Sequence, residues 1–146
     1  MTPGVAIVGC GLIGSKRAAA LAGARLVACA DVTVARAEAL AEKSGTAVAT
    51  RDWRVAIDRR DVDIVIVATT NDALAEVTRF ALGAGKHVLV EKPAARSVEE
   101  IDPVIEAAAG SNRIVRVGCN HRYHPALQKA RELVDSGVLG PLMFLR

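Results

Sequence analysis

The feature that most constrains this chain is a group of three glycines near its start, Gly9, Gly11 and Gly14, in the pattern G-x-G-x-x-G. The group directly follows an apolar run, Val5–Val8, and precedes a helix-like segment. In a strand–turn–helix unit of this kind, the first glycine allows a tight turn and the second lets the backbone approach a pyrophosphate. The third lets the helix pack closely on the strand. The pattern therefore predicts a dinucleotide site.

An acidic residue stands at the distance that such a site requires. A second apolar run, Arg25–Ala30, ends at Asp31, twenty residues after the middle glycine. A carboxylate at the tip of the second strand can accept both ribose hydroxyls of an adenosine, and its charge repels a 2′-phosphate. The first helical amides, those of Leu12 and Ile13, are expected to face the phosphates. We therefore expect NAD as the cofactor in preference to NADP. Arg36, one turn into the next helix, is the residue that would favour NADP by binding its 2′-phosphate.

The size and composition of the chain fit one α/β domain without disulfides. A chain of 146 residues can bury roughly 68–70% of its unfolded surface. Hydrophobic residues make up 51% of it and aromatics 3%, so the core must be aliphatic, as in helices packed on a parallel sheet. The net charge is +3 and the basic residues are scattered, which argues against nucleic acid as a partner. Three cysteines favour reduced thiols, and we expect a cytoplasmic protein with no membrane span.

Short apolar runs alternate with helical periods along the whole chain. The predicted strands are Val5–Val8, Leu26–Ala30, Ala47–Ala49, Ile64–Ala68, His87–Val90 and Ile114–Gly118. The predicted helices are Ile13–Ala22, Val34–Ser44, Asp52–Asp58, Asp72–Leu82, Val98–Ala109 and Pro125–Ser136. Repeated βα units imply a parallel sheet with right-handed crossovers. We expect a doubly wound α/β fold of the Rossmann type over residues 1–122, followed at 123–146 by a linking helix and the first strand, Leu142–Leu145, of a domain that the chain does not complete.

A polar loop follows the fourth predicted strand. Thr69, Thr70 and Asn71 stand at the carboxyl edge of the sheet, where they can bond the ribose or the diphosphate of a cofactor. The alternative is an ordinary helix start, in which Asn71 or Asp72 caps the first amides of the next helix. Both roles can hold at once.

The fifth predicted strand runs directly into Glu91, Lys92 and Pro93. A lysine at this edge can exchange a proton with a hydroxyl or carbonyl while hydride moves to or from a nicotinamide ring. Pro93 restricts the backbone beside the lysine, and the bond before it can be cis. On composition alone, the same three residues at a strand end read as a charged turn.

These motifs occur in the order and at the spacing of one known family. The glycine turn, Asp31, the Ala68–Asn71 loop and the segment Gly85–Pro93 together resemble the N-terminal half of the Gfo/Idh/MocA oxidoreductases. Gly118–Pro125 resembles the next motif of that family. Members oxidise secondary alcohols of sugars and cyclitols or reduce the matching carbonyls.

The resemblance implies a role for particular residues. Lys92 matches the lysine that contacts the reacting oxygen, and Glu91 completes its motif beside the cofactor. Asn120, Arg122 and Tyr123 match the loop that edges the nicotinamide and the substrate. We thus expect Asn120 to contact the cofactor and Arg122 and Tyr123 to contact a sugar-like substrate.

Two departures from the family pattern set the alternatives. A histidine that members often carry a few residues after the Thr69–Asn71 loop is absent, and so is the family's second domain, an antiparallel sheet that completes catalysis. The first hypothesis is an oxidoreductase domain whose missing half comes from a separate chain or from the rest of a longer gene product. The protein partner expected is a chain carrying the C-terminal domain or a homo-oligomer. The alternative is a non-catalytic module or fragment that binds the dinucleotide without turnover. His121, His124 and Cys119 fit no compact zinc spacing, so we expect polar loop residues and no metal.

Overall fold

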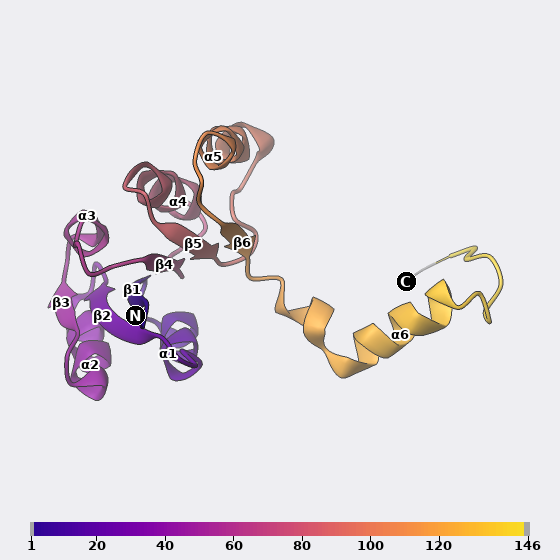
Figure 1. Ribbon diagram of the computed structural model, residues 1–146, viewed down its shortest axis with the longest axis horizontal. Helices are drawn as coiled ribbons and strands as arrows, with labels where there is room; N and C mark the ends of the chain where they lie inside the picture. The colour runs from indigo at the N-terminus through magenta and orange to yellow at the C-terminus, as the bar shows by residue number, and fades with distance from the viewer. Residues whose placement is uncertain (1, 145–146) are drawn as a thin grey trace.

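A six-stranded parallel sheet with helices on both faces forms the body of the protein in the computed structural model, which describes residues 2–144 (Figure 1). The strands lie in the order β3-β2-β1-β4-β5-β6, which is the doubly wound arrangement expected from the sequence. They span β1 (Gly4–Val8), β2 (Arg25–Ala30), β3 (Val48–Thr50), β4 (Ile64–Val67), β5 (His87–Val90) and β6 (Val115–Val117). The helices are α1 (Leu12–Ala19), α2 (Val34–Ser44), α3 (Trp53–Ile57), α4 (Leu74–Gly83), α5 (Val98–Ala109), the 3-10 helix η1 (Asn120–Tyr123) and α6 (Pro125–Asp135).

The strand side chains build a core on each face of the sheet. In β1, Ala6 and Val8 belong to the cluster under α3, α4 and α5, whereas Val5 and Ile7 belong to the cluster under α1 and α2. This alternation follows from the two-residue period of a strand. Because both faces are covered, all five residues of β1 are buried, as the continuous apolar run predicted.

The elements of the sheet match the sequence prediction, but several helix ends differ. The first helix was expected to continue to Ala22 and ends at Ala19. There the backbone closes tighter bonds, from the Ala20 amide to the Arg17 carbonyl and from the Leu21 amide to the Ala18 carbonyl, before a turn at Gly23 with φ of +77°. The fourth helix begins at Leu74 rather than Asp72, because the Ala73 amide bonds back to the Thr70 carbonyl in a turn.

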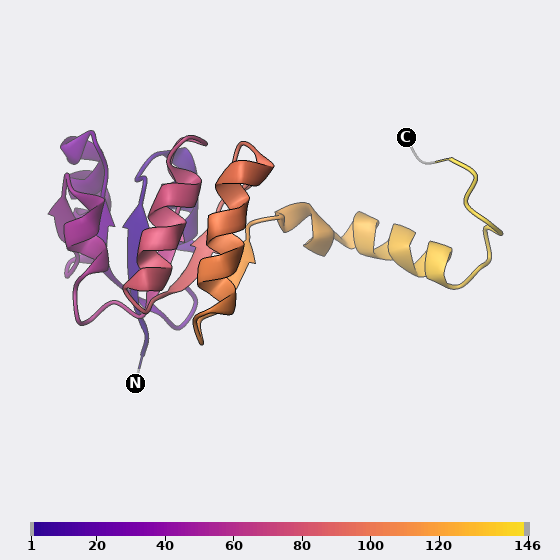
Figure 2. The ribbon, with the colours of Figure 1, turned by 90° about the horizontal axis from the view of Figure 1, so that it is seen from above.

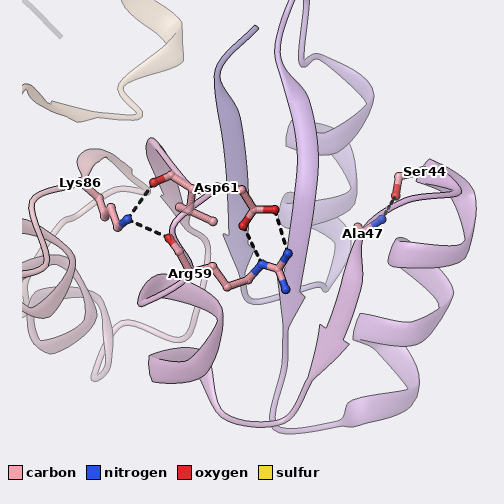
Figure 3. Close-up of polar contacts among 6 residues, drawn as sticks. Ser44, Ala47, Arg59, Asp61 and Lys86 are labelled. Atoms are coloured by element: carbon pink, nitrogen blue, oxygen red, sulfur yellow. Dashed lines mark hydrogen bonds and ion pairs between the residues drawn. The ribbon is translucent and has the colours of Figure 1, made fainter. Parts of the chain in front are cut away.

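Polar contacts of Lys86 and Arg59 hold the segments that precede β4 and β5 (Figure 3). The Lys86 ammonium donates to the carbonyls of Arg59 and Val62, at 2.9 and 2.8 Å. The Arg59 guanidinium donates through two nitrogens to the two carboxylate oxygens of Asp61, at 2.9 and 2.8 Å. These bonds tie the loop before β4 to the start of β5. They lie at the opposite end of the sheet from the carboxyl edge.

Helix α6 stands away from the sheet (Figure 2). It packs against η1, and none of its side chains is buried. Its apolar side chains fall within one stripe of the helix, at Ala126, Leu127, Ala130, Leu133 and Val134. Residues 142–144 carry no strand pairing with the described residues, and Leu145 lies outside them. The strand expected there stays a prediction.

Candidate dinucleotide site

The three glycines of the turn differ in what surrounds them. Gly9 has φ of +91°, and a Cβ there would lie 2.4 Å from the Ala68 carbonyl oxygen. A Cβ at Gly14 would lie 2.0 Å from the Gly9 carbonyl oxygen, so α1 can approach β1 only with glycine at this position. At Gly11, nothing lies within 4 Å of an added Cβ. The first and third glycines are thus required by the protein's own packing, whereas the second borders open space.

The start of α1 offers backbone donors beside that open space. Gly11 is the N-cap, and no side chain bonds to the first amides of the helix. Gly11, Leu12 and Ile13 all line the adjoining cleft. Unpaired amides at a helix start carry the positive end of the helix dipole, and they favour an anion such as a diphosphate.

The Asp31 side chain links the glycine turn to the loop between β2 and α2. The residue is buried, with 8% of its surface exposed. One carboxylate oxygen accepts a hydrogen bond from the Cys10 amide at 2.8 Å, and the other accepts one from the Thr33 amide at 2.8 Å. Each oxygen retains a second lone pair, so the carboxylate can still accept the hydroxyls of a ribose.

Cys10 takes part in this arrangement through its backbone amide. Its thiol is buried and points to the Ala30 carbonyl oxygen at 3.4 Å. Hydrogen bonding with Cys29, together with burial, raises the pKa of the Cys10 thiol well above its usual range. The raised pKa favours the protonated thiol, and burial shields it from solvent.

A cleft of about 330 Å³ runs along the carboxyl ends of β1, β2 and β4. Seven of the predicted cofactor residues line it: Gly9, Gly11, Leu12, Ile13, Asp31, Thr69 and Thr70. Gly14 lies behind the turn, where it packs on β1. Asn71 is exposed and does not line the cleft. The alternative of a side-chain cap at this loop is wrong, because α4 begins after Ala73 with no side-chain cap bond.

The Asp31 end of the cleft is bordered by Arg36, Arg51 and Trp53. Trp53 packs edge-on against Phe80, with ring centroids 5.1 Å apart. Sequence reasoning noticed Arg36 but missed Arg51 and Trp53 as site residues. Arg51 directly follows β3, and its place at the cleft depends on β3 lying beside β2. Knowing that β3 pairs with β2 would have been enough to predict Arg51 as a site residue.

Glu91 and Asn120 lie in a second cluster, around Arg17 of α1. The Arg17 Nε donates to a Glu91 carboxylate oxygen at 2.6 Å, and a terminal nitrogen donates to the Asn120 Oδ1 at 3.0 Å. The Arg17 and Glu91 side chains are 20% and 12% exposed. No role was predicted for Arg17, although it lies three residues after Gly14 and so shares that side of the helix.

Lys92, Arg122 and Tyr123 are exposed and border no part of the cleft. Lys92 follows β5 at the same carboxyl edge of the sheet, and its bond to Pro93 is cis. Arg122 and Tyr123 belong to η1, with Tyr123 71% exposed. These three residues thus follow strands whose carboxyl ends lie at the same edge of the sheet as the cleft, but their side chains do not line the cleft.

His124, which directly follows η1, has a local role. The His124 Nδ1 accepts a hydrogen bond from the Ala126 amide and caps α6. Within residues 2–144, no three His, Cys, Asp or Glu side chains gather in a way that would hold a metal ion. In the same part of the chain, no helix has both the length and the apolar character needed to cross a bilayer.

Comparisons with known proteins agree on one family. The model of the GFO_IDH_MocA family, described as an oxidoreductase family with an NAD-binding Rossmann fold, matches residues 4–119. An inositol 2-dehydrogenase from Salmonella paratyphi B is 37% identical over 150 residues, which cover 98% of this chain and 45% of that protein. The chain therefore spans less than half the length of this curated relative.

Solved structures extend the same likeness. The structure of myo-inositol dehydrogenase from Lactobacillus casei in complex with NAD(H) and myo-inositol has a TM-score of 0.89 at 25% identity. The matched region covers 96% of this chain and 43% of the Lactobacillus casei chain. A levoglucosan dehydrogenase in complex with NADH and levoglucosan has a TM-score of 0.88 at 30% identity, with 96% of this chain and 41% of that chain covered.

Proposed function

We propose that this chain, which belongs to the Gfo/Idh/MocA family of oxidoreductases, binds NAD in the cleft and serves the oxidation of a sugar or cyclitol alcohol. The observation that carries the proposal is the open space at Gly11, bordered by uncapped helix amides on one side and by Asp31 on the other. A diphosphate fits the amides, and a ribose fits the carboxylate. The substrate class follows from relatives named for inositol and levoglucosan.

The residues of the cleft divide the cofactor between them in this proposal. The Leu12 and Ile13 amides hold the diphosphate, and Asp31 accepts the adenosine ribose hydroxyls. Thr69 and Thr70 border the opposite wall of the cleft. Bound NAD would accept the hydride that leaves the alcohol carbon.

Lys92 supplies the proton chemistry in this proposal. Its Nζ would take the proton of the alcohol hydroxyl when the carbonyl forms, and it would return it in the reverse direction. Arg122 and Tyr123 follow β6 on the same edge and would contact the hydroxyls of the polyol. Support for these roles comes from the order of the strands, which brings the ends of β4, β5 and β6 side by side.

The binding step is tested by titrating the purified chain with NADH and following the nicotinamide fluorescence. We expect saturable binding below millimolar NADH. Gly11→Val should abolish it, because the added side chain occupies the space that the diphosphate needs. A folded wild-type chain with no saturable response at millimolar NADH would contradict the proposal.

The proton-transfer step is tested with Lys92→Met. We expect this variant to bind NADH within about twofold of wild type, because the diphosphate contacts lie elsewhere, and to lose any NAD-dependent oxidation of myo-inositol measured at 340 nm. Lys16→Met removes the same charge from an exposed position on α1 and should change neither quantity. Undiminished oxidation by Lys92→Met would show that another group moves the proton.

A second candidate is a dinucleotide-binding module without turnover. It is favoured by the exposure of Lys92, which no described side chain directs toward the cleft. A wild-type chain that binds NADH tightly and oxidises no polyol would support this candidate over the first.

For either function we propose a cytoplasmic location, which suits three unpaired cysteines, two of them buried.

A further inference from the structure

One guanidinium joins three segments that carry predicted site residues. Arg17 lies on α1, whose first amides border the cleft, and it contacts Glu91 after β5 and Asn120 in η1. Helical side chains tilt toward the start of their helix, so the Arg17 side chain leans back toward the glycine turn and the carboxyl edge. The diphosphate end of the site and the Lys92 end are therefore linked through one side chain.

The packing around this contact is close. A Cβ at Gly118 would lie 2.9 Å from a terminal nitrogen of Arg17 and 3.0 Å from a Glu91 carboxylate oxygen. Gly118 is itself held by its amide, which donates to the Val90 carbonyl at 2.8 Å. The Arg17 and Glu91 side chains thus fill the space that a side chain at residue 118 would take. Their position accounts for a glycine at this residue.

Among the ion pairs of residues 2–144, the Arg17–Glu91 pair has the least exposed side chains. Both of its side chains are at least four-fifths buried, whereas those of Arg54 and Glu76 are 50% and 57% exposed. Exposed pairs of that kind contribute little, because water screens them and both side chains lose freedom. In a largely desolvated pair, removing one partner leaves an uncompensated charge, so the geometry is held strongly.

We propose that Arg17 is a positioning residue that sets Lys92 and Asn120 against the nicotinamide end of the cofactor, an inference that rests on the proposed NAD binding. Arg17 holds the Glu91 carboxylate, and Glu91 is bonded directly along the chain to Lys92. The hydrogen bond from Arg17 also makes Oδ1 the occupied end of the Asn120 amide, which leaves its Nδ2 as the donor end for a ligand. Glu91 contacts Arg17, and its expected contact with the cofactor stays a prediction.

The experiment compares two ligands, NADH and ADP-ribose, which has the same adenosine diphosphate and ribose but no nicotinamide. Arg17→Met should weaken NADH about tenfold and leave ADP-ribose within about twofold, because only the nicotinamide end loses its positioned neighbours. Arg17→Lys should fall between wild type and Arg17→Met, because an ammonium lacks the planar fork that reaches Glu91 and Asn120 together. The control Lys16→Met should leave both affinities unchanged.

Gly118→Ala supplies an independent arm that removes no functional group. Its Cβ meets only the far ends of two flexible side chains, so the fold should persist while the pair is displaced. We expect a selective loss of NADH affinity of about three- to tenfold. Thermal unfolding of each variant checks that the chain is folded.

The outcomes separate this inference from the proposed function. A wild-type chain that binds neither ligand would overturn the NAD site and the positioning role together. Wild-type binding with an equal loss of both ligands in Arg17→Met, or with no loss of either in Arg17→Met and Gly118→Ala, would overturn the positioning role and leave the NAD site standing.

Discussion

Adding one methyl group at Gly11 or at Gly14 should give opposite results, although the two glycines lie three residues apart in the same turn. At Gly14 the methyl carbon would lie 2.0 Å from the Gly9 carbonyl oxygen and 3.2 Å from the Ile7 Cγ2. Relief requires α1 to move away from β1, because a backbone oxygen has no rotamer to change. At Gly11 the methyl group meets nothing within 4 Å, and φ of −71° is open to any residue.

The expected magnitudes follow from these contacts. Overpacking in a rigid core costs about 1–3 kcal/mol, and a clash with backbone belongs at the upper end. With about 2–4 °C of melting temperature per kcal/mol for a chain of this size, Gly14→Ala should melt roughly 6–12 °C below wild type. Gly11→Ala should stay within about 0.5 kcal/mol of wild type, as surface substitutions do. Its methyl group should nevertheless weaken NADH by at least about tenfold, or 1.4 kcal/mol, because it enters the space proposed for the diphosphate.

The assay is thermal unfolding by circular dichroism, combined with NADH titration of both variants at a temperature where each is folded. Two results would refute the reasoning. One is a Gly11→Ala chain that melts as low as Gly14→Ala, which would mean that the space at Gly11 is filled by the protein. The other is a stable Gly11→Ala chain that binds NADH like wild type, which would mean that the cofactor lies elsewhere.

Three further predictions concern the cofactor, the thiols and α6. NADH should bind about one to two decades more tightly than NADPH, because the Asp31 carboxylate repels the 2′-phosphate at a cost of roughly 1–3 kcal/mol, and equal affinities would show that Arg36 outweighs it. Thiol labelling of the folded chain should modify Cys119 rapidly and Cys10 only on unfolding, since the former is exposed and the latter is buried with a raised pKa; rapid labelling of Cys10 would contradict the buried turn. The purified chain should also self-associate through the apolar stripe of α6 and the residues after it, more strongly than a version ending at Ser136, and light scattering that finds both strictly monomeric would remove this expectation.

The sequence predicted those parts of the structure that depend on neighbours along the chain. The glycine turn, the six strands and their parallel order follow from short apolar runs and helix periods, and the structure confirms them. Asp31 could be placed beside the turn because both motifs lie in one strand–helix–strand unit. The cap expected at Asn71 or Asp72 was wrong, because a turn from Thr70 to Ala73 delays the helix.

The residues that sequence reasoning missed are those placed by long-range packing. Arg51 reaches the cleft because β3 pairs with β2, and Arg17 meets Glu91 across 74 residues of chain. Neither contact has a local sequence pattern that marks these two arginines. Glu91 was expected on the cofactor because of its place in the Glu-Lys-Pro motif, and its described partner is Arg17.

The bonds that Asp31 makes with the Cys10 and Thr33 amides have a consequence for redesigning the cofactor preference. Replacing the carboxylate by a small neutral residue is the direct route toward NADP, but here it would also leave two backbone donors without their acceptor, one of them inside the glycine turn. The Cys10 amide is buried, so leaving it unsatisfied costs about 1–3 kcal/mol. A redesign that kept Asp31 and recruited the neighbouring guanidinium groups of Arg36 and Arg51 would avoid that cost. The same carboxylate therefore sets the cofactor preference and holds the glycine turn. A change of preference from NAD to NADP would have to begin with residues on the rim of the cleft.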